Sequence, residues 1–182
     1  LVRLRTDHLD LVQIHQRDER TPLVETMGEL DRLRVEGKVR EIGVSNFETR
    51  DLLEAEAATA SLHDRALISV QSPLSLIDRR AASSVLPWAQ QRGCGFLAYS
   101  PLAAGHLTGS SKVDTPMPIR KVVQDTLLPI AVEHGVSAAA VALAWVFQQP
   151  GITAAIAGAS SPSQVIQQVK ALKLKLTAQE ME

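Results

Sequence analysis

The sequence is poor in the residues on which several classes of protein depend. Its only cysteine, Cys94, excludes an internal disulfide framework and fits a reducing compartment, so we expect a cytoplasmic protein. No apolar run approaches the ~20 residues that a membrane-spanning helix needs. The five histidines and the single cysteine show no metal-ligand spacing, so no metal site is predicted.

No charge of one sign dominates, and two familiar nucleotide-binding motifs are missing. Nineteen basic and twenty acidic residues leave a formal net charge of -1, which gives no electrostatic reason to expect nucleic acid or an anionic membrane as a partner. The G-x-G-x-x-G pattern of a doubly wound dinucleotide-binding sheet does not occur, and neither does the P-loop pattern. The sequence therefore argues against both of those folds.

What the sequence does contain is a regular alternation of two periodicities. Five apolar segments have the character of strands, and they cover residues 9–14, 39–44, 67–71, 95–99 and 152–157. Helical patterns fill the gaps, at 21–38, 48–60, 79–92 with a bend near Pro87, 118–134, 137–149 and 162–170. Strands that alternate with helices in this way predict parallel pairing and an α/β fold.

A polar or small residue stands at the carboxyl end of each predicted strand. In chain order these residues are His15, Ser45 with Asn46, Gln71, Tyr99 with Ser100, and Gly158. Taken alone, His15 is better explained as a core histidine with a satisfied hydrogen bond. However, the carboxyl ends of parallel strands meet on one face, where ligands bind, so the repeated placement predicts a shared pocket.

The even spacing of the strands favours a (β/α)8 barrel, but five strands are too few to close one. Such barrels usually need at least ~200 residues. We therefore expect a partial barrel whose two ends, at Leu1 and in "KLTAQEME", are cuts in a longer pattern. An open sheet exposes its edges, so self-association through exposed sheet edges is also predicted.

Four stretches, in the right order and each at a strand end, carry a resemblance to a known family. They are "TDHLDLVQIH", "LRVEGKVREIGVSNF", "AYSPLAAGHLTG" and "AIAGASSPSQV". Together they resemble the C-terminal part of the aldo-keto reductases, NAD(P)H-dependent enzymes built on a (β/α)8 barrel. The resemblance implies a single domain over residues 1–182 that holds strands four to eight, with the three N-terminal βα units absent.

The resemblance also implies a role for individual residues. His15 matches the catalytic histidine, which orients and polarises the substrate carbonyl. Ser45, Asn46 and Gln71 match the residues that hydrogen-bond the nicotinamide carboxamide, and Tyr99 matches the aromatic ring that stacks on the nicotinamide. The positions that match the pyrophosphate loop are Ser100, Leu102, Ala103 and Gly105. The positions that match the adenosine end are Gly158, Ala159, Ser160, Gln164, Gln167 and Gln168.

Each motif also has a plain structural explanation. "VSNF" fits a helix-capping turn made by Ser45 or Asn46, and "YSPL" fits an ordinary Ser-Pro turn. "SSPSQ" fits an N-cap serine followed by proline at the first helical position. Their shared placement at strand ends favours the functional interpretation over these alternatives.

The sequence departs from the family pattern in ways that bear on activity. The family's general acid is a tyrosine, helped by a lysine and an aspartate on the second and third strands, and this segment is absent here. Tyr99 is the only tyrosine and already matches the stacking position. Leu74 stands where the family often has an aromatic residue, which we expect to affect substrate selectivity. Ser160 and Gln164 are neutral, so NADP(H) and NAD(H) both stay open as the cofactor.

The resemblance implies an oxidoreductase that reduces an aldehyde or ketone to an alcohol, with a small-molecule carbonyl substrate. The proton-donating tyrosine is missing from this chain, so we expect little activity from the chain alone. The alternatives are a non-catalytic NAD(P)-binding regulatory subunit, similar to the channel-associated members of the family, and a truncated inactive homologue.

Overall fold

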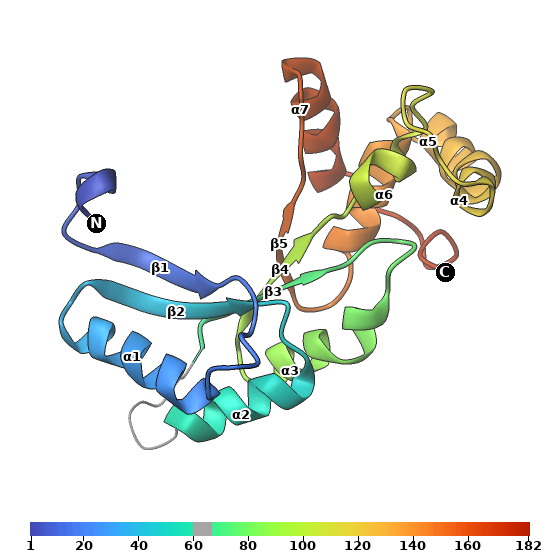
Figure 1. Cartoon of the computed structure of the whole chain (residues 1–182). Helices are drawn as coiled ribbons and strands as arrows, with labels where there is room; N and C mark the ends of the chain where they lie inside the picture. Colours follow the sequence, from blue (N-terminus) through green and yellow to red (C-terminus); the bar gives the residue numbers. More distant parts are fainter. Residues whose placement is uncertain (60–66) are drawn as a thin grey trace. The chain divides into compact units, whose positions relative to one another are not determined.

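Strands and helices alternate along the chain in the computed structural model, which describes residues 1–59 and 67–182 (Figure 1). The strands are β1 (Leu9–Ile14), β2 (Val39–Ser45), β3 (Ser69–Pro73), β4 (Gly95–Tyr99) and β5 (Ile152–Ile156). They run parallel and follow one another in the sheet in the order β1-β2-β3-β4-β5. The prediction of five parallel strands with intervening helices, a partial (β/α)8 barrel, is confirmed.

The chain divides into two compact units. The first comprises Leu1–Ser72 and Ser84–Phe96, and the second comprises Pro73–Ser83 and Leu97–Glu182. The α-helices of the first unit are α1 (Leu23–Val35), α2 (Thr49–Thr59) and α3 (Val85–Gln91). Those of the second are α4 (Met117–Val122), α5 (Leu128–Glu133), α6 (Ala138–Phe147) and α7 (Pro162–Val169). The single domain expected over residues 1–182 stays a prediction.

The core of the first unit lies between β2 and the helices that cover it. The α1 and α2 helices lie side by side, and α1 packs on β2 (Figure 1). Met27 of α1, Val44 of β2 and Leu52 of α2 are fully buried. Burying such side chains contributes about 1.5–3 kcal/mol each. This packing fixes the direction of β2 and hence the position of the residues that follow it.

The core of the second unit is α6, which is apolar on nearly all sides. Eight of its ten residues are buried, among them Leu143 and Trp145. The helix begins after Ser137, whose hydroxyl accepts a hydrogen bond from the backbone N–H of Ala140 at 3.2 Å. A serine at the N-cap satisfies a donor that the helix itself cannot pair. This hydrogen bond fixes the amino end of α6 at Ser137.

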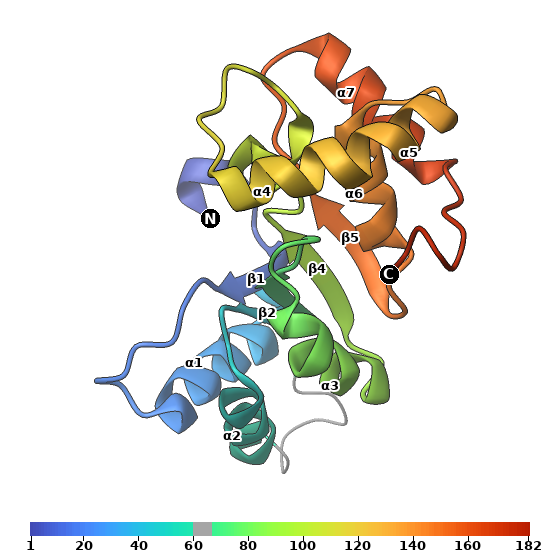
Figure 2. The ribbon, with the colours of Figure 1, turned by 90° about the vertical axis from the view of Figure 1, so that its right-hand side faces the viewer.

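One predicted helix, at 118–134, contains a π-helical turn. Val123–Leu127 (η4) joins α4 to α5, and Figure 2 shows the three pieces as one continuous rod. The N–H of Leu128 bonds to the carbonyl of Val123, five residues earlier. Pro129 explains the wider turn, because it has no N–H and its ring crowds the carbonyl four residues before it.

The described part of the chain has no single helix that is long and apolar enough to cross a membrane. One pair of helices, Met117–Glu133 and Ala138–Phe147, meets the length and composition requirements together, but it is bent by 89°.

Several predicted boundaries moved. The third helix breaks at Ser84, between the 3-10 turn Arg80–Ser83 (η2) and α3, and not at Pro87. Pro87 lies in the first turn of α3, where a missing N–H costs nothing. Pairing of β3 continues beyond Gln71, since Leu74 N–H donates to the Tyr99 carbonyl at 3.2 Å. The predicted second helix ends at Thr59, and residue 60 lies outside the described residues.

Candidate functional site

In the first unit the sheet register brings the predicted residues of three strand ends together. Ile14 of β1 pairs with Val44 of β2, and Ser45 pairs with Gln71 of β3. His15 and Asn46 are the next residues along β1 and β2. The carboxyl ends of the three strands therefore form one row, as the spacing of the polar residues predicted.

Asn46 connects the three strand ends by hydrogen bonds. Its side-chain Nδ2 donates to the His15 carbonyl at 2.9 Å and to the Ser45 hydroxyl at 3.1 Å. Its backbone N–H donates to the Gln71 carbonyl at 3.0 Å. The backbone of Asn46 is left-handed, with φ 59°, a conformation that asparagine tolerates better than most residues.

The amino end of the α2 helix lies a few residues beyond Ser45 and Asn46. The α2 helix begins at Thr49, and the carboxylate of Asp51 accepts a hydrogen bond from the Glu48 N–H at 3.0 Å. The Glu48 N–H at the amino end of α2 is thus paired with Asp51, and the explanation of "VSNF" as a capping turn stays a hypothesis. Position and hydrogen bonding make Asn46 the link between strand ends.

His15 is exposed, so the alternative of a core histidine is wrong. The loop that follows it is anchored by Arg17, whose Nη1 lies 2.6 Å from Asp51 Oδ1 and 2.7 Å from Glu54 Oε2. Burial raises the pKa of Asp51, but the hydrogen bonds from Glu48 N–H and Arg17 outweigh it and hold that pKa below its usual range. The ion pair ties the loop after His15 to α2.

In the second unit the loop after β4 has an unusual backbone. Ser100, Ala103, Ala104 and Gly105 all have positive φ angles, between 48° and 94°. Three of the four carry a Cβ, which makes this conformation costly, and such strain gathers at binding sites. The N–H of Ala103 donates to the Ser100 carbonyl, and that of Gly105 to the Leu102 carbonyl, both at 2.9 Å. "YSPL" is thus a turn, and it leads into a strained loop.

This loop forms one wall of a cavity of about 790 Å³ within the second unit. Nine predicted cofactor-binding residues line it, namely Ser100, Leu102, Gly105, Gly158, Ala159, Ser160, Gln164, Gln167 and Gln168. The remaining wall comes from residues around Thr108 and Lys112 and from the amino end of α6. Two segments far apart in the sequence, the loop after β4 and the loop after β5, therefore share one cavity.

The cavity suits an anionic ligand. The amino ends of two helices line it, α6 through Ser137 and Ala139 and α7 through Ser163. Each amino end carries a partial positive charge. Lys112 adds a full charge, and none of the described residues that line the cavity is acidic. A group with phosphate oxygens fits such surroundings.

The loop after β5 is shaped by its own glutamines. Gln164 Oε1 accepts from the Ser160 N–H at 2.6 Å and from its hydroxyl at 3.1 Å, and Gln168 Nε2 donates to the Gly158 carbonyl at 2.8 Å. "SSPSQ" does contain an N-cap, since Ser161 accepts from the Gln164 N–H and Pro162 opens α7. The cap and the cavity lining occur together in this stretch.

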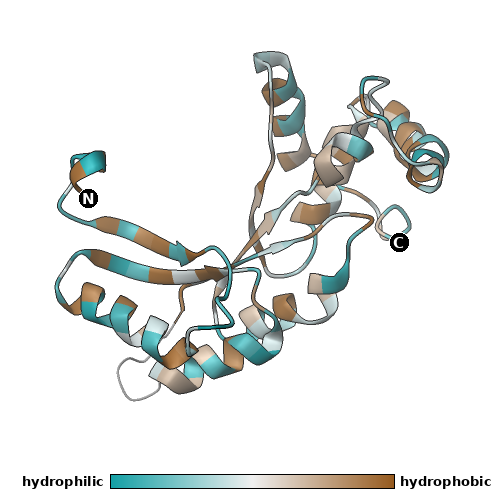
Figure 3. Cartoon of the chain, viewed as in Figure 1, coloured by the Kyte–Doolittle hydropathy of each residue, from teal (hydrophilic) through white to brown (hydrophobic). Residues whose placement is uncertain are grey.

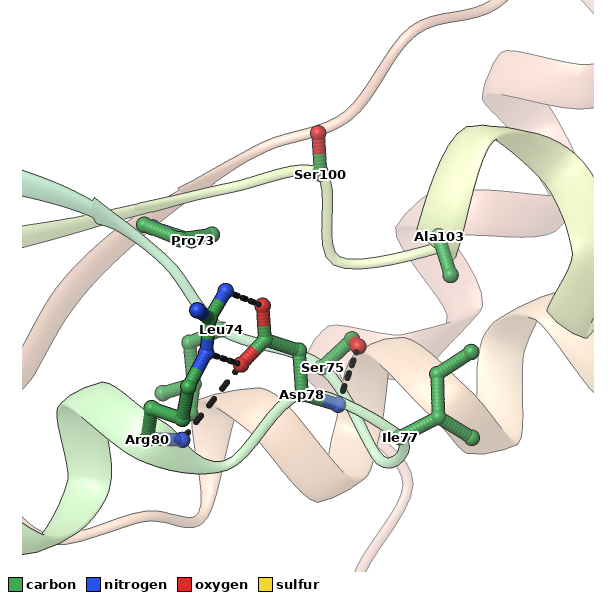
Figure 4. Close-up of a pocket in the computed structure, with 8 residues that line it drawn as sticks. All are labelled: Pro73, Leu74, Ser75, Ile77, Asp78, Arg80, Ser100 and Ala103. Carbon is green, nitrogen blue, oxygen red and sulfur yellow. Dashed lines mark hydrogen bonds and ion pairs between the residues drawn. The ribbon is translucent and has the colours of Figure 1, made fainter. Parts of the chain in front are cut away.

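A smaller cavity of about 390 Å³ is also lined by residues of the loop after β4 (Figure 4). Ala103 lines this cavity, whereas Ser100 lines both. The charged residues that line the smaller cavity form an ion pair. Arg80 Nε lies 2.9 Å from Asp78 Oδ1, and Arg80 Nη2 lies 2.8 Å from Asp78 Oδ2. The fully buried Leu74 contributes to its apolar wall. This cavity therefore offers an apolar surface and an ion pair already satisfied.

The predicted residues thus form two groups, each within one unit. The first unit brings together His15, Ser45, Asn46 and Gln71, and the second brings together the residues of the two cavities. Tyr99 ends β4 and is half-buried, and it lines neither of the two described cavities. Lys112 was missed by the sequence analysis. The sequence could have identified it, because Lys112 is the only lysine or arginine between Ser100 and Met117, in the loop that was matched to the pyrophosphate.

Comparison with known proteins gives the family. The model of the Aldo/keto reductase family matches residues 1–182, and the chain belongs to this family. It is 36% identical over 186 residues to the uncharacterized oxidoreductase YrpG of Bacillus subtilis (strain 168), covering 97% of this chain and 57% of that protein. It is 32% identical over 192 residues to a probable voltage-gated potassium channel subunit beta of Oryza sativa subsp. japonica, covering 94% and 58%.

Solved structures agree with this assignment. A thermostable aldo-keto reductase, Tm1743, in complex with the inhibitor epalrestat is 31% identical, with a TM-score of 0.82. The match covers 99% of this chain and 60% of the other. The chain thus spans less than three fifths of the curated relatives named above. The resemblance found in the sequence is confirmed.

Proposed function

We propose that this chain holds the nicotinamide cofactor of an NAD(P)H-dependent oxidoreductase of the aldo-keto reductase type, which reduces an aldehyde or ketone to an alcohol. The observation that carries the proposal is the larger cavity of the second unit. It combines nine residues matched to the family's cofactor positions with two helix amino ends and Lys112, and no acidic residue lines it among those described.

The residues present fit a dinucleotide. Ser100, Leu102 and Gly105 would border the pyrophosphate, with Lys112 as its cationic partner. Ser160, Gln164, Gln167 and Gln168 would lie at the adenosine end. Gly158 keeps the cavity open, since no atom lies within 4 Å of the place where a Cβ would stand. When bound, the cofactor supplies a hydride to the carbonyl carbon.

We further propose roles for the remaining matched residues, as the resemblance to the family implies them. Ser45, Asn46 and Gln71 carry the amide and hydroxyl groups that a carboxamide can pair with, and Tyr99 would stack on the nicotinamide ring. The exposed imidazole of His15 would orient the substrate carbonyl by donating a hydrogen bond to its oxygen. Leu74 lines the smaller cavity at the position where the family often has an aromatic residue. It would therefore offer a substrate an aliphatic contact in place of an aromatic one.

A second candidate follows from the single tyrosine. If Tyr99 stacks on the cofactor, no tyrosine of this chain remains as general acid, and losing such an acid costs ~10²–10⁴ in rate. A chain that binds NADP(H) or NAD(H) without turnover would be a regulatory subunit or an inactive homologue. One relative is described as a probable potassium channel subunit beta. We propose weak binding and little turnover for the chain alone.

Calorimetric titration of the chain with NADPH and with NADH tests the proposal. We expect binding of at least one nucleotide, weakened about tenfold in Lys112→Ala by loss of a charge-assisted hydrogen bond. Lys121→Ala is the matched control, because it removes an equal charge from an exposed position that does not line the cavity. Absence of binding, or equal loss in both variants, contradicts the proposal. Turnover of a simple aldehyde then separates the enzyme from the non-catalytic binder.

We also propose that the protein is cytoplasmic and that it self-associates. The Cys94 thiol is buried and donates to the Leu67 carbonyl, as suits a residue kept reduced. The exposed edges of the sheet, at β1 and β5, support self-association. A second support is the α7 face, defined as Val165, Ile166, Val169 and Leu172. Between 48% and 63% of each of these residues is exposed, and α7 has no buried residue. Figure 3 shows hydrophobic positions along α7. The β5 strand, which precedes α7 in the chain, is an edge of the sheet.

A further inference from the structure

A chain of hydrogen bonds runs across the sheet of the first unit and ends at Gln71. Gln71 Nε2 donates to Gln13 Oε1 at 3.0 Å, and Gln13 Nε2 donates to Ser69 Oγ at 3.0 Å. We call these three side chains the amide relay. Its members come from β1 and β3, with β2 between them.

The relay can cross β2 only because Gly43 lies beneath it. Gln13, Gly43 and Ser69 are direct neighbours in the register of the three strands. A Cβ on Gly43 would stand 2.3 Å from Ser69 Oγ and 3.0 Å from Gln13 Cγ. The glycine therefore makes room for the Gln13 side chain of β1 to reach across β2 to β3.

In the structure the relay leaves the oxygen end of the Gln71 amide available. Gln13 uses its oxygen for Gln71 and its nitrogen for Ser69, so turning the Gln71 amide alone would set two carbonyl oxygens against each other. In the part of the chain that the structure describes, no donor reaches Gln71 Oε1. The relay thus commits the nitrogen of Gln71 to Gln13 and leaves its oxygen as an acceptor.

We infer that Gln13 is a positioning residue, which orients Gln71 to accept a hydrogen bond from the carboxamide NH₂ of the nicotinamide. This inference rests on the proposed function. Gln71 would then distinguish the two ends of the carboxamide, because an acceptor pairs with its NH₂ and repels its oxygen. Cofactor orientation would depend on a side chain that does not itself touch the cofactor.

The test compares two ligands that differ only in that group. NADP⁺ or NAD⁺, whichever the chain binds, carries the NH₂, whereas its 3-acetylpyridine analogue has a methyl group there and keeps the oxygen. We expect the unsubstituted chain to bind the natural nucleotide about tenfold more tightly, the typical cost of a lost hydrogen bond in a site built for it. Calorimetry gives the ratio of the two dissociation constants.

Two substitutions of Gln13 separate positioning from a general structural effect. Gln13→Met keeps the length and removes the amide, and we expect the ratio to fall to about threefold or less. Gln13→Glu keeps an acceptor for Gln71 Nε2, with the Ser69 hydroxyl turning to donate, and we expect the ratio to stay within about twofold of the unsubstituted value. A merely structural loss would weaken both ligands equally and leave the ratio unchanged.

The outcomes are distinct. If the unsubstituted chain binds neither nucleotide, the proposed function fails and the inference with it. If it binds but the ratio is the same in Gln13→Met, or is near one from the start, the inference alone is overturned. Ser69→Ala, which removes the far end of the relay, is expected to lower the ratio as well, and it decides the question if Gln13→Met does not fold.

Discussion

Asn46 Nδ2 donates a 2.9 Å hydrogen bond to the backbone carbonyl of His15, thirty-one residues earlier in the chain. The backbone of Asn46 is left-handed, with φ 59°. At this one position the side chain therefore makes a long-range hydrogen bond and the backbone has a conformation that few residues tolerate. We expect Asn46→Gly, which keeps the backbone, to lower the free energy of unfolding by about 1 kcal/mol.

Asn46→Ala is expected to cost about 1 kcal/mol more than Asn46→Gly, because alanine is also strained in the left-handed region. Urea denaturation of the two variants and the unsubstituted chain gives both differences. Equal stability of the alanine and glycine variants would show that the left-handed conformation is not required at this position.

Arg17 and its two carboxylate partners allow a buried ion pair to be compared with an exposed one. The Asp51 side chain is only 7% exposed, whereas that of Glu54 is 45% exposed. We expect Arg17→Met to lower the free energy of unfolding more than Glu54→Gln does, because it leaves the largely buried Asp51 with only the longer, 3.6 Å ion-pair contact to Arg50. Glu54→Gln, the control, is expected to cost less than about 1 kcal/mol. Similar losses in both variants would contradict the assignment of Asp51 as the principal partner.

The lowered pKa of Asp51 predicts a specific acid sensitivity. An unfolded aspartate titrates near ~3.9, so the stabilisation due to this carboxylate is complete above that pH. It is lost as the pH falls through the lowered folded pKa, because protonation ends the ion pair with Arg17. We expect the difference in unfolding free energy between the unsubstituted chain and Asp51→Asn to shrink from about pH 5 to about pH 3. A difference that stays constant over this range would refute the prediction.

Gly43 and Ser69 are expected to be energetically coupled. A Cβ at Gly43 meets Ser69 Oγ at 2.3 Å, so Gly43→Ala is predicted to cost about 2–3 kcal/mol through overpacking. Combining it with Ser69→Ala removes the clashing oxygen. The double variant is therefore expected to lose at least about 1 kcal/mol less than the sum of the single variants, as measured by a double-mutant cycle. Simple additivity would show that the backbone, and not the hydroxyl, sets the cost.

The sequence predicted most of the fold because its two periodicities are local. β1 and β4 were placed at their observed bounds, and the register that joins Ser45 to Gln71 follows from parallel strands of similar length. The bend at Ser84 and the π-helical turn before Pro129 were not predicted. Each depends on how a proline fits the turn around it, which a hydrophobic pattern does not record.

The candidate site was predicted less completely, for a different reason. Residues matched to motifs were found, but Lys112 belongs to no motif and enters the cavity through the path of its loop. The amide relay was also missed, since Gln13, Gly43 and Ser69 are thirty and twenty-six residues apart and meet only through the register. Contacts made across strands need the structure.

The α7 face predicts how the chain behaves at high concentration. Ile166 is 63% exposed within an apolar surface, so Ile166→Glu is expected to shift the chain toward monomer in sedimentation velocity experiments. Val24→Glu is the control, because Val24 is similarly exposed, at 58%, but lies on α1. Apolar association does not weaken as salt screens charge, so raising the ionic strength should leave the oligomer intact. If both variants behave alike, or if salt dissociates the oligomer, a surface other than the α7 face holds the copies together.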